Sequence, residues 1–324
     1  MQTIQVAFAS DNNYAQHMAV SIVSLLKNVD DSIAVHIYIL YEDLEKRHID
    51  NLKKLIGLHE NTEIEFVKLS LDDFSGYPLH TEWHSIATYF RLKLPSLLPH
   101  IDRIAYLDSD IIVCGDISNV WKSFMADNVM LQAVEEPTPL YAHRLESLGM
   151  KVGSPYFNGG VLFLNLKKMR EKCFEDNAVS YIQQYNRYIQ FQDQDVLNAL
   201  CEGDWKPLPL NWNSFFFVLE GIYKDKYRLY KRQDVLNAKS KPAIIHFNQH
   251  PKPWAEGCID PRRMEYFKYL EYTPYKGFTV NQAKSICPVL KAYFSKIILQ
   301  INIYCPSLYV LLRSFKRRIV KAHG

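Results

Sequence analysis

Ile104-Ala-Tyr-Leu-Asp108-Ser-Asp110-Ile-Ile-Val113 places two carboxylates, two positions apart, between two short apolar runs. Apolar runs of about four to eight residues without polar alternation are typical of strands buried on both faces of a parallel sheet. Asp108 and Asp110 would share one face there. Neighbouring carboxylates repel each other and are costly to bury, so they require hydrogen bonds or a cation. Their oxygen atoms suit Mg²⁺ or Mn²⁺, which can also bind the phosphates of a nucleotide.

A second Asp-x-Asp occurs at Asp193-Gln-Asp195, and about one such pair is expected by chance in a chain of this length. The second pair begins a predicted helix, where either Asp193 or Asp195 would act as a cap. The first pair follows a buried strand, where an unpaired carboxylate pair would be expensive. Context therefore favours a functional role for Asp108 and Asp110.

Strands and helices alternate on either side of the opening stretch. Apolar runs predict strands at residues 4–9, 35–40 and 63–67, so we expect an α/β fold with a parallel or mixed sheet flanked by helices. Ligands bind at the carboxyl ends of such strands, which places the polar loop at Asp11 near Asp108. Neither G-x-G-x-x-G nor G-x-x-x-x-G-K-[ST] occurs, so a dinucleotide-binding fold and a P-loop are not supported. The other predicted elements are helices at 18–26, 44–56, 83–98, 121–125 and 167–185 and strands at 130–136 and 244–246.

Three further polar segments each have an ordinary structural explanation. Asn158-Gly159-Gly160 is typical of a tight turn feeding a buried strand, in which glycine lets the backbone approach a ligand. His246 follows a short apolar strand, where a lone histidine is more often a hydrogen-bonded core residue than a ligand. Lys252, between two prolines, is explained by itself as a solvated surface lysine. Only their joint occurrence, in this order, favours a site.

Composition places the chain of 324 residues among globular proteins. Hydrophobic residues make up 48% and charged residues 23%, close to the average of soluble domains, and the length suffices for one large core or two smaller ones. The N-terminus lacks the charged and apolar regions of a signal peptide, so we expect a cytoplasmic protein.

Charge is unevenly distributed along the chain. Residues 1–271 contain all 35 acidic residues and 29 of the 38 basic ones, a net charge of −6, whereas the nine remaining basic residues give the C-terminal segment +9. This predicts a tail that binds an anionic surface rather than a nucleic-acid-binding protein. Residues 284–321 have apolar residues at near-helical spacing, and the uncharged segment 297–312 is too short and polar to span a bilayer. A basic amphipathic helix on a membrane surface is expected, and a C-terminal helix packed on the core is the alternative.

Six motifs, in this order, resemble glycosyltransferase family 8, retaining enzymes that include bacterial lipopolysaccharide and lipooligosaccharide galactosyl- and glucosyltransferases. The resemblance covers residues 4–260 and implies a GT-A-like, Rossmann-like fold. We therefore expect a nucleotide-sugar-binding catalytic domain at residues 1–275 and a basic, aromatic-rich segment at residues 276–324, whose association with a membrane the resemblance favours. The motifs are Phe8-Ala-Ser-Asp11-Asn-Asn13-Tyr14, His84-Ser-Ile-Ala-Thr-Tyr-Phe-Arg91-Leu, Tyr106-Leu-Asp108-Ser-Asp110, Tyr156-Phe-Asn158-Gly-Gly-Val-Leu, Gln192-Asp193-Gln194-Asp195, and His246 with Lys252-Pro-Trp254.

The resemblance implies how a UDP-sugar would be held at its diphosphate. Asp108, Asp110 and His246 would bind Mn²⁺, or alternatively Mg²⁺, and the ion would bridge the two phosphates. Lys252 would neutralise the leaving diphosphate. Arg91 would reach both phosphate and sugar.

The nucleoside would be held at the end of the first strand. By the same resemblance, Asp11 and Asn13 would contact the uridine together with the backbone near Phe8 and Ala9. Tyr14 belongs to the same substrate-binding motif, although a place in the core is its simplest explanation.

The donor sugar would be held by two later motifs. The resemblance implies that Asp193 and Asn158 hydrogen-bond its hydroxyl groups beside Gly159 and Gly160. Gln194 would lie close to the anomeric carbon, which makes Gln194 and Asp193 the candidate catalytic residues.

Charge neutralisation explains why such a site suits UDP as a leaving group. A divalent cation and a lysine would neutralise the diphosphate as the glycosidic bond breaks. Double displacement needs a carboxylate on the far face of the sugar, whereas the family places an amide, Gln194, there. A same-face mechanism is therefore expected, with Asp193 as the fallback nucleophile. One departure from the galactosyltransferase pattern is Gln249 or a neighbour, which stands where that pattern has a glycine whose backbone contacts phosphate.

Two other functions remain open. A phosphohydrolase of the haloacid dehalogenase type also has Asp-x-Asp after an apolar strand and would use Asp108 as its nucleophile. A non-catalytic UDP-sugar-binding protein would bind the nucleotide without turnover. We expect Mn²⁺-dependent, retaining transfer of galactose or glucose from a UDP-sugar to a glycolipid or surface-polysaccharide precursor such as lipopolysaccharide core. The enzyme would act at the inner face of the bacterial plasma membrane.

Overall fold

The computed structural model of the chain describes residues 3–79, 85–136, 142–215, 229–256, 258, 260–278, 301 and 308. The strands are β1 (Thr3–Ala9), β2 (Ala34–Tyr41), β3 (Thr62–Lys68), β4 (Arg103–Leu107), β5 (Ile111–Val113), β6 (Leu131–Glu135), β7 (Phe157–Asn165), β8 (Trp205–Pro207), β9 (Ser214–Phe215) and β10 (Ile244–His246). The α-helices are α1 (Ala15–Leu26), α2 (Lys46–Lys53), α3 (Leu94–Leu97), α4 (Ser118–Met125), α5 (Ala142–Ser147), α6 (Leu166–Glu171), α7 (Phe174–Tyr185), α8 (Gln192–Leu200), α9 (Arg232–Ser240) and α10 (Arg263–Leu270). Short 3₁₀ helices are η1 (Lys54–Leu58), η2 (Leu71–Phe74), η3 (Ile86–Lys93), η4 (Asn186–Tyr188) and η5 (Leu210–Asn213).

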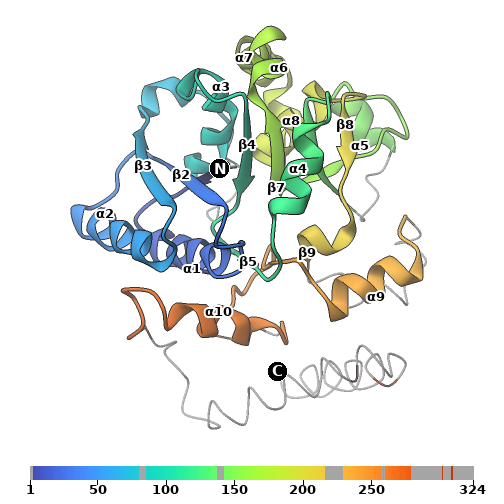
Figure 1. Cartoon of the computed structure of the whole chain (residues 1–324). Helices are drawn as coiled ribbons and strands as arrows, with labels where there is room; N and C mark the ends of the chain where they lie inside the picture. The colour runs from blue at the N-terminus through green and yellow to red at the C-terminus, as the bar shows by residue number, and fades with distance from the viewer. Residues whose placement is uncertain are drawn as a thin grey trace, which may run out of the picture.

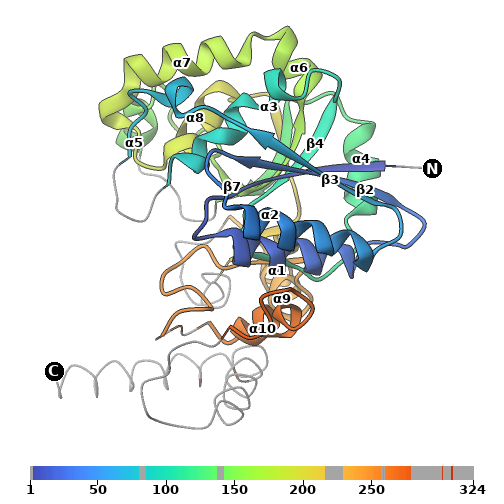
Figure 2. The ribbon, with the colours of Figure 1, turned by 90° about the vertical axis from the view of Figure 1, so that its left-hand side faces the viewer.

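A seven-stranded mixed sheet forms the centre of the molecule (Figure 1). Its strand order is β3-β2-β1-β4-β7-β6-β8. β7 runs antiparallel to β4 and β6, and the other neighbouring pairs are parallel. Figure 2 shows α1 and α2 on one face of the sheet and α3, α6, α7 and α8 on the other. The predicted α/β fold with a mixed sheet flanked by helices is therefore confirmed.

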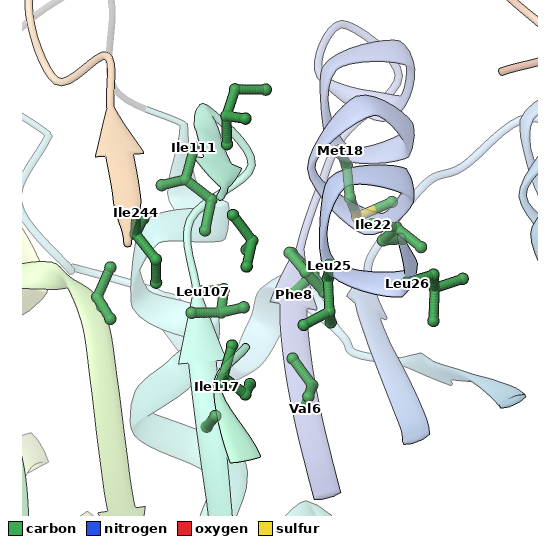
Figure 3. Packing of buried hydrophobic residues seen from close by; sticks show 14 of the residues in the cluster. Val6, Phe8, Met18, Ile22, Leu25, Leu26, Leu107, Ile111, Ile117 and Ile244 are labelled. Carbon is green, nitrogen blue, oxygen red and sulfur yellow. The ribbon is translucent and has the colours of Figure 1, made fainter. Parts of the chain in front are cut away.

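Both faces of the sheet are buried, which explains the apolar runs without polar alternation. In β1, Val6 and Phe8 belong to the cluster on the α1 side, whereas Ala7 between them belongs to the cluster on the opposite face. Figure 3 shows Phe8 of β1 beside Leu25 of α1. The strand therefore points apolar side chains in both directions, as the sequence predicts.

A second, three-stranded sheet has the order β5-β10-β9. β10 pairs antiparallel with β5, which places His246 opposite Ile111, and pairs parallel with β9, which places His246 beside Phe215. The chain leaves the large sheet at Leu107 and enters the small sheet at Ile111. Asp108, Ser109 and Asp110 thus form the crossing between the two sheets.

The predicted turn at residues 158–160 is wrong. Asn158, Gly159 and Gly160 lie inside β7, which is buried along its whole length. Both glycines lack the positive φ of a tight turn. Close approach of neighbouring side chains, rather than chain reversal, explains them.

Two predicted helices are broken into shorter elements. Within residues 83–98 the described part forms η3 and then the single turn α3, because Pro95 cannot donate the hydrogen bond that a continuous α-helix needs but fits a first turn. Residues 167–185 divide into α6 and α7 at Cys173, whose left-handed φ of 50° interrupts the helical path. Residues 83 and 84 lie outside the described chain.

The predicted membrane-associating tail lies almost wholly outside the described residues. The last continuous stretch of described residues ends at residue 278, and beyond it only residues 301 and 308 are described. Within the described part of the chain, every helix is too short or too polar to cross a membrane.

Candidate functional site

The crossing segment from Asp108 to Asp110 is held at each of its three residues. The Asp108 N–H donates to the Gly160 carbonyl of β7 (2.9 Å). The Ser109 hydroxyl donates to the last carbonyl of β1 (2.8 Å). The Asp110 carbonyl accepts from the Phe247 N–H just after β10 (3.0 Å). Both carboxylates are therefore positioned by strands of the two sheets before any ligand binds.

His246 completes a cluster with the two carboxylates. One ligand atom from each of Asp108, Asp110 and His246 lies within 4.8 Å of the others. His246 Nε2 is 3.8 Å from Asp108 Oδ2 and 3.3 Å from Asp110 Oδ1. Asp110 Oδ1 is buried and has no hydrogen-bond partner among the described residues. An unsatisfied buried carboxylate oxygen beside an imidazole nitrogen suits a divalent cation, because such an ion would compensate its desolvation.

Gly160 lies directly against this cluster. A Cβ atom at this position would lie 2.8 Å from Asp108 Oδ2 and would collide with the His246 ring at Cε1. Only glycine therefore lets β7 pass so close to two of the three candidate ligands.

Arg91 connects the cluster to the second Asp-x-Asp motif. Its Nη2 lies 2.8 Å from Asp108 Oδ1 and its Nε lies 3.0 Å from Asp193 Oδ2, while Nη1 donates to the Gly159 carbonyl. Burial by itself lowers the Arg91 pKa, but Asp108 and Asp193 outweigh it and raise that pKa above its ordinary value. Burial raises the pKa of Asp193 to about 7, although Arg91 opposes the shift. The Arg91 guanidinium carbon also lies over the Tyr106 ring, 4.0 Å from the ring centroid.

Lys252 faces the other carboxylate. Its Nζ donates to Asp110 Oδ2 (2.6 Å) and to the Phe247 carbonyl (2.8 Å). Burial opposes ionisation of Asp110, but Lys252 and His246 hold the Asp110 pKa well below its usual range. The explanation of Lys252 as a solvated lysine is wrong, because its side chain is buried. Gln249, in the same loop, is exposed.

Gln194 is held in one orientation by two neighbours. Its Oε1 accepts the Gly159 N–H (2.8 Å) and its Nε2 donates to the Tyr156 hydroxyl (3.3 Å). Tyr156 in turn donates to Asp195 Oδ1 (2.7 Å). These bonds place the Gln194 amide beside the strand that carries Gly159 and Gly160.

The prediction that Asp193 or Asp195 is the N-terminal cap of a helix is wrong. The residue that precedes α8 is Phe191, without a side-chain cap bond. Asp195 Oδ2 instead accepts the N–H groups of Gln190 and Phe191 and pairs with Arg144 at 2.5 Å. Asp195 is fully buried, so it orders the loop before α8.

The loop after β1 is organised by Asp11, whose Oδ1 accepts the N–H groups of Asn13 (2.9 Å) and Tyr14 (3.0 Å). Asn13 is exposed. The Phe8 side chain is fully buried in the core, so only the Phe8 backbone is available to a ligand. The Ala9 carbonyl already accepts the Ser109 hydroxyl. Burial, together with nearby acidic side chains that include Asp110 and Asp108, raises the Tyr14 pKa. The loop therefore lies next to the acidic cluster, as the parallel pairing of β1 and β4 predicts.

Two residues at the site were not selected from the sequence as site residues. Asn213 Oδ1 lies 2.9 Å from His246 Nδ1, and Tyr156 joins Gln194 to Asp195. Tyr156 begins one of the six motifs, which was a usable signal. Asn213 ends η5 and reaches His246 because β9 pairs with β10, and no local pattern indicates that pairing.

Comparison with known proteins gives one consistent result. The model of the family "Glycosyl transferase family 8" matches residues 5–258. General stress protein A of Bacillus subtilis is 28% identical over 278 residues, which cover 84% of this chain and 94% of that protein. A lipopolysaccharide 1,2-glucosyltransferase of Escherichia coli K12 is 28% identical over 294 residues, covering 90% and 85% of the two chains. The solved structure of the galactosyltransferase LgtC with donor and acceptor sugar analogues superposes with a TM-score of 0.74 at 25% identity, covering 84% of this chain and 96% of that one.

Proposed function

The chain belongs to glycosyltransferase family 8, and from that premise we propose that it transfers galactose or glucose from a UDP-sugar to a hydroxyl group of a glycolipid or surface-polysaccharide precursor. The observation that carries the proposal is the Asp108, Asp110 and His246 cluster with Lys252 bonded to one of its carboxylates. The similarity to a lipopolysaccharide 1,2-glucosyltransferase supports lipopolysaccharide core as the kind of acceptor.

Asp108, Asp110 and His246 would hold the divalent ion. Two carboxylates with one imidazole favour Mn²⁺ over Mg²⁺, because Mg²⁺ prefers oxygen ligands alone. The ion would supply positive charge that stabilises the diphosphate as it leaves.

Lys252 would supply the second positive charge. Its ammonium group has three N–H donors, of which two serve Asp110 and the Phe247 carbonyl. The third is available to a phosphate oxygen. Arg91, in contrast, uses its guanidinium to keep Asp108, Asp193 and the Gly159 carbonyl in fixed positions.

The surroundings of Gln194 favour transfer on one face of the sugar. The Gln194 carbonyl oxygen already accepts the Gly159 N–H, and an amide oxygen is a poor nucleophile. In the proposed reaction the bond between the anomeric carbon and UDP breaks, the acceptor oxygen forms its bond on the same face, and the leaving phosphate takes the acceptor's proton. Asp193, with its pKa raised to about 7 by burial, is the alternative nucleophile in a double displacement.

The basic segment after Glu271 would attach the enzyme to an anionic membrane. The acceptor proposed above is a membrane lipid or a precursor linked to one, so attachment would bring the site to its substrate. This corresponds to a peripheral enzyme at the inner face of the bacterial plasma membrane.

The test is slow hydrolysis of a panel of UDP-sugars with Mn²⁺, which needs no acceptor. We expect UDP release from UDP-galactose or UDP-glucose that is lost with a chelator. Asp108→Ala and His246→Ala should each lower it by about 10²-fold or more. Asp73→Ala and His100→Ala, at exposed positions, are matched controls that should keep the wild-type rate.

Unchanged hydrolysis in Asp108→Ala and His246→Ala would contradict the assignment of the metal ligands. A trapped phosphoryl group on Asp108 would instead show a phosphohydrolase. Binding of UDP without turnover of any donor would show a non-catalytic protein.

A further inference from the structure

Three hydrogen bonds connect the backbone of β7 to the His246 ring, and each of them fixes the direction of the next. The first joins the Gly160 N–H to Asn158 Oδ1 (2.9 Å). A backbone N–H can only donate, so the Asn158 atom that faces it must be the oxygen. The Asn158 Nδ2 then points the other way and donates to Glu136 Oε2 (3.2 Å), which agrees with this orientation.

The orientation of Asn158 determines that of Asn213. Asn213 Nδ2 lies 3.0 Å from the same Asn158 oxygen. Only the amide nitrogen can donate there, so Asn213 must present its oxygen on the opposite side. That oxygen lies 2.9 Å from His246 Nδ1. Asn213 is fully buried, so water cannot replace either partner.

The orientation of Asn213 determines the tautomer of His246. A neutral imidazole carries one N–H, and an oxygen that accepts at Nδ1 requires the hydrogen to be there. Nε2 then presents its lone pair toward Asp108 Oδ2 and Asp110 Oδ1.

The opposite tautomer would close the site. With only the two carboxylates as neighbours, the imidazole would place its hydrogen on Nε2 and donate it to Asp110. That hydrogen would occupy the lone pair that a metal ion needs. A partner on Nδ1 is therefore required to keep Nε2 available.

We propose that Asn213 is a positioning residue that holds His246 as the Nδ1–H tautomer, with Nε2 directed at Asp108 and Asp110 for metal binding. Asn158 and the Gly160 N–H act behind it and set its direction. The proposal rests on the proposed function only in assigning His246 to the metal. The tautomer itself is a property of the protein without metal or sugar.

The tautomer is measured by long-range ¹H–¹⁵N correlation spectra of the metal-free full-length protein, labelled at histidine, at a pH where His246 is neutral. His246→Gln identifies the His246 signals by their loss. We expect the pattern of an Nδ1–H imidazole in the wild type. In Asn213→Leu, which is similar in size and lacks the oxygen, the hydrogen should move wholly or partly to Nε2. Asn213→Asp loses the donor to Asn158 Oδ1 but keeps an acceptor at Nδ1, so it should retain the wild-type pattern.

The second readout is the affinity for Mn²⁺ alone, measured from the electron paramagnetic resonance signal of free Mn²⁺. Asn213→Leu should weaken binding by about 10- to 100-fold, and Asn213→Asp should recover most of the loss. The signals of His59, a buried histidine bonded to Thr62, should stay unchanged and report an intact fold.

An Nε2–H pattern in the wild type would overturn the proposal without any variant. An Nδ1–H pattern and wild-type Mn²⁺ affinity in Asn213→Leu would overturn it as well. Failure of the proposed function looks different, because the tautomer and the Mn²⁺ affinity would follow these expectations while no UDP-sugar was turned over.

Discussion

At residue scale, the lack of a side chain at Gly160 leaves the space that the site needs. The sequence predicts a turn at residues 158–160, because consecutive glycines are common in turns. The structure places Gly160 in an extended strand, where its missing Cβ leaves room for Asp108 and the His246 ring. Its N–H also begins the series of bonds that orients His246. The neighbouring Gly159 is less constrained, since its Cβ would lie 3.4 Å from Gln194 Cβ and 3.5 Å from Arg91 Nη1.

Alanine at these two positions should therefore have very different effects. Gly160→Ala should displace His246 or Asp108 and lower the rate of UDP-sugar hydrolysis by about 10²-fold, the effect expected of a displacement of about 1 Å in a catalytic site. Gly159→Ala is the matched control and should keep the rate within several-fold of wild type. Steady-state kinetics with Mn²⁺ titration would measure both. Similar losses in the two variants would argue against the close approach at Gly160 as the cause.

At the scale of elements, α1 holds the crossing segment through a buried polar stripe. Ser21 donates to the Ser109 carbonyl (2.9 Å), and Ser24 accepts the Val113 N–H (2.8 Å). Just after the helix, Asn28 donates to the Tyr269 hydroxyl of α10 (2.8 Å). These positions are three or four residues apart and so share one helix face. The apolar periodicity that predicts this helix does not reveal the stripe, because its partners lie in the crossing segment, β5 and α10, far away in the sequence.

His17 belongs to the same face of α1 and connects it to two other segments. Its ring stacks on the Trp254 ring, with the two ring centroids 3.5 Å apart. Its Nδ1 lies 2.7 Å from the Tyr266 hydroxyl of α10. Burial lowers the His17 pKa to about 3, with Asp110 opposing the shift and Lys252 adding to it. The unfolded chain binds a proton on His17 near pH 6.5 whereas the folded protein does not, so folding loses free energy as the pH falls from about 6.5 toward 3.

Replacing His17 should remove this part of the acid sensitivity. Between pH 7 and pH 4.5, the wild type should lose roughly 2 to 3 kcal/mol more unfolding free energy than His17→Gln. Urea unfolding at a series of pH values would measure the difference, with the exposed His100→Gln as control. Parallel pH curves for wild type and His17→Gln would show that His17 is protonated without cost.

At the scale of the whole molecule, the charge is divided between a net negative body and a basic C-terminal segment. Residues 1–271 carry −6 and the rest carries +9. An anionic membrane would attract the segment and repel the body, which favours an enzyme that touches the membrane at one end.

Neutralising the three consecutive basic residues 316–318 as glutamines in the full chain should weaken binding to anionic vesicles. At about 1 kcal/mol for each base, the affinity should fall by roughly 10²-fold. Binding of the wild type should also fall as salt is raised and should be absent with zwitterionic vesicles. A matched control replaces the exposed Lys46, Lys53 and Lys54 of the body. Equal losses in the two variants in co-sedimentation would contradict a role specific to the tail.

The sequence by itself determined the alternation of strands and helices, the buried sheet, the position of Asp108 and Asp110 at the end of a buried strand, and the family. These follow from local patterns, since apolar runs, motif order and spacing are written along the chain. Tertiary structure alone decided that Asn213 touches His246, that Gly160 leaves space rather than turns, and that Lys252 is buried against Asp110. Each of these depends on which strands pair and in which register, as when β10 places His246 opposite Ile111. That choice minimises the free energy of the whole packed chain, so no short stretch of sequence contains it.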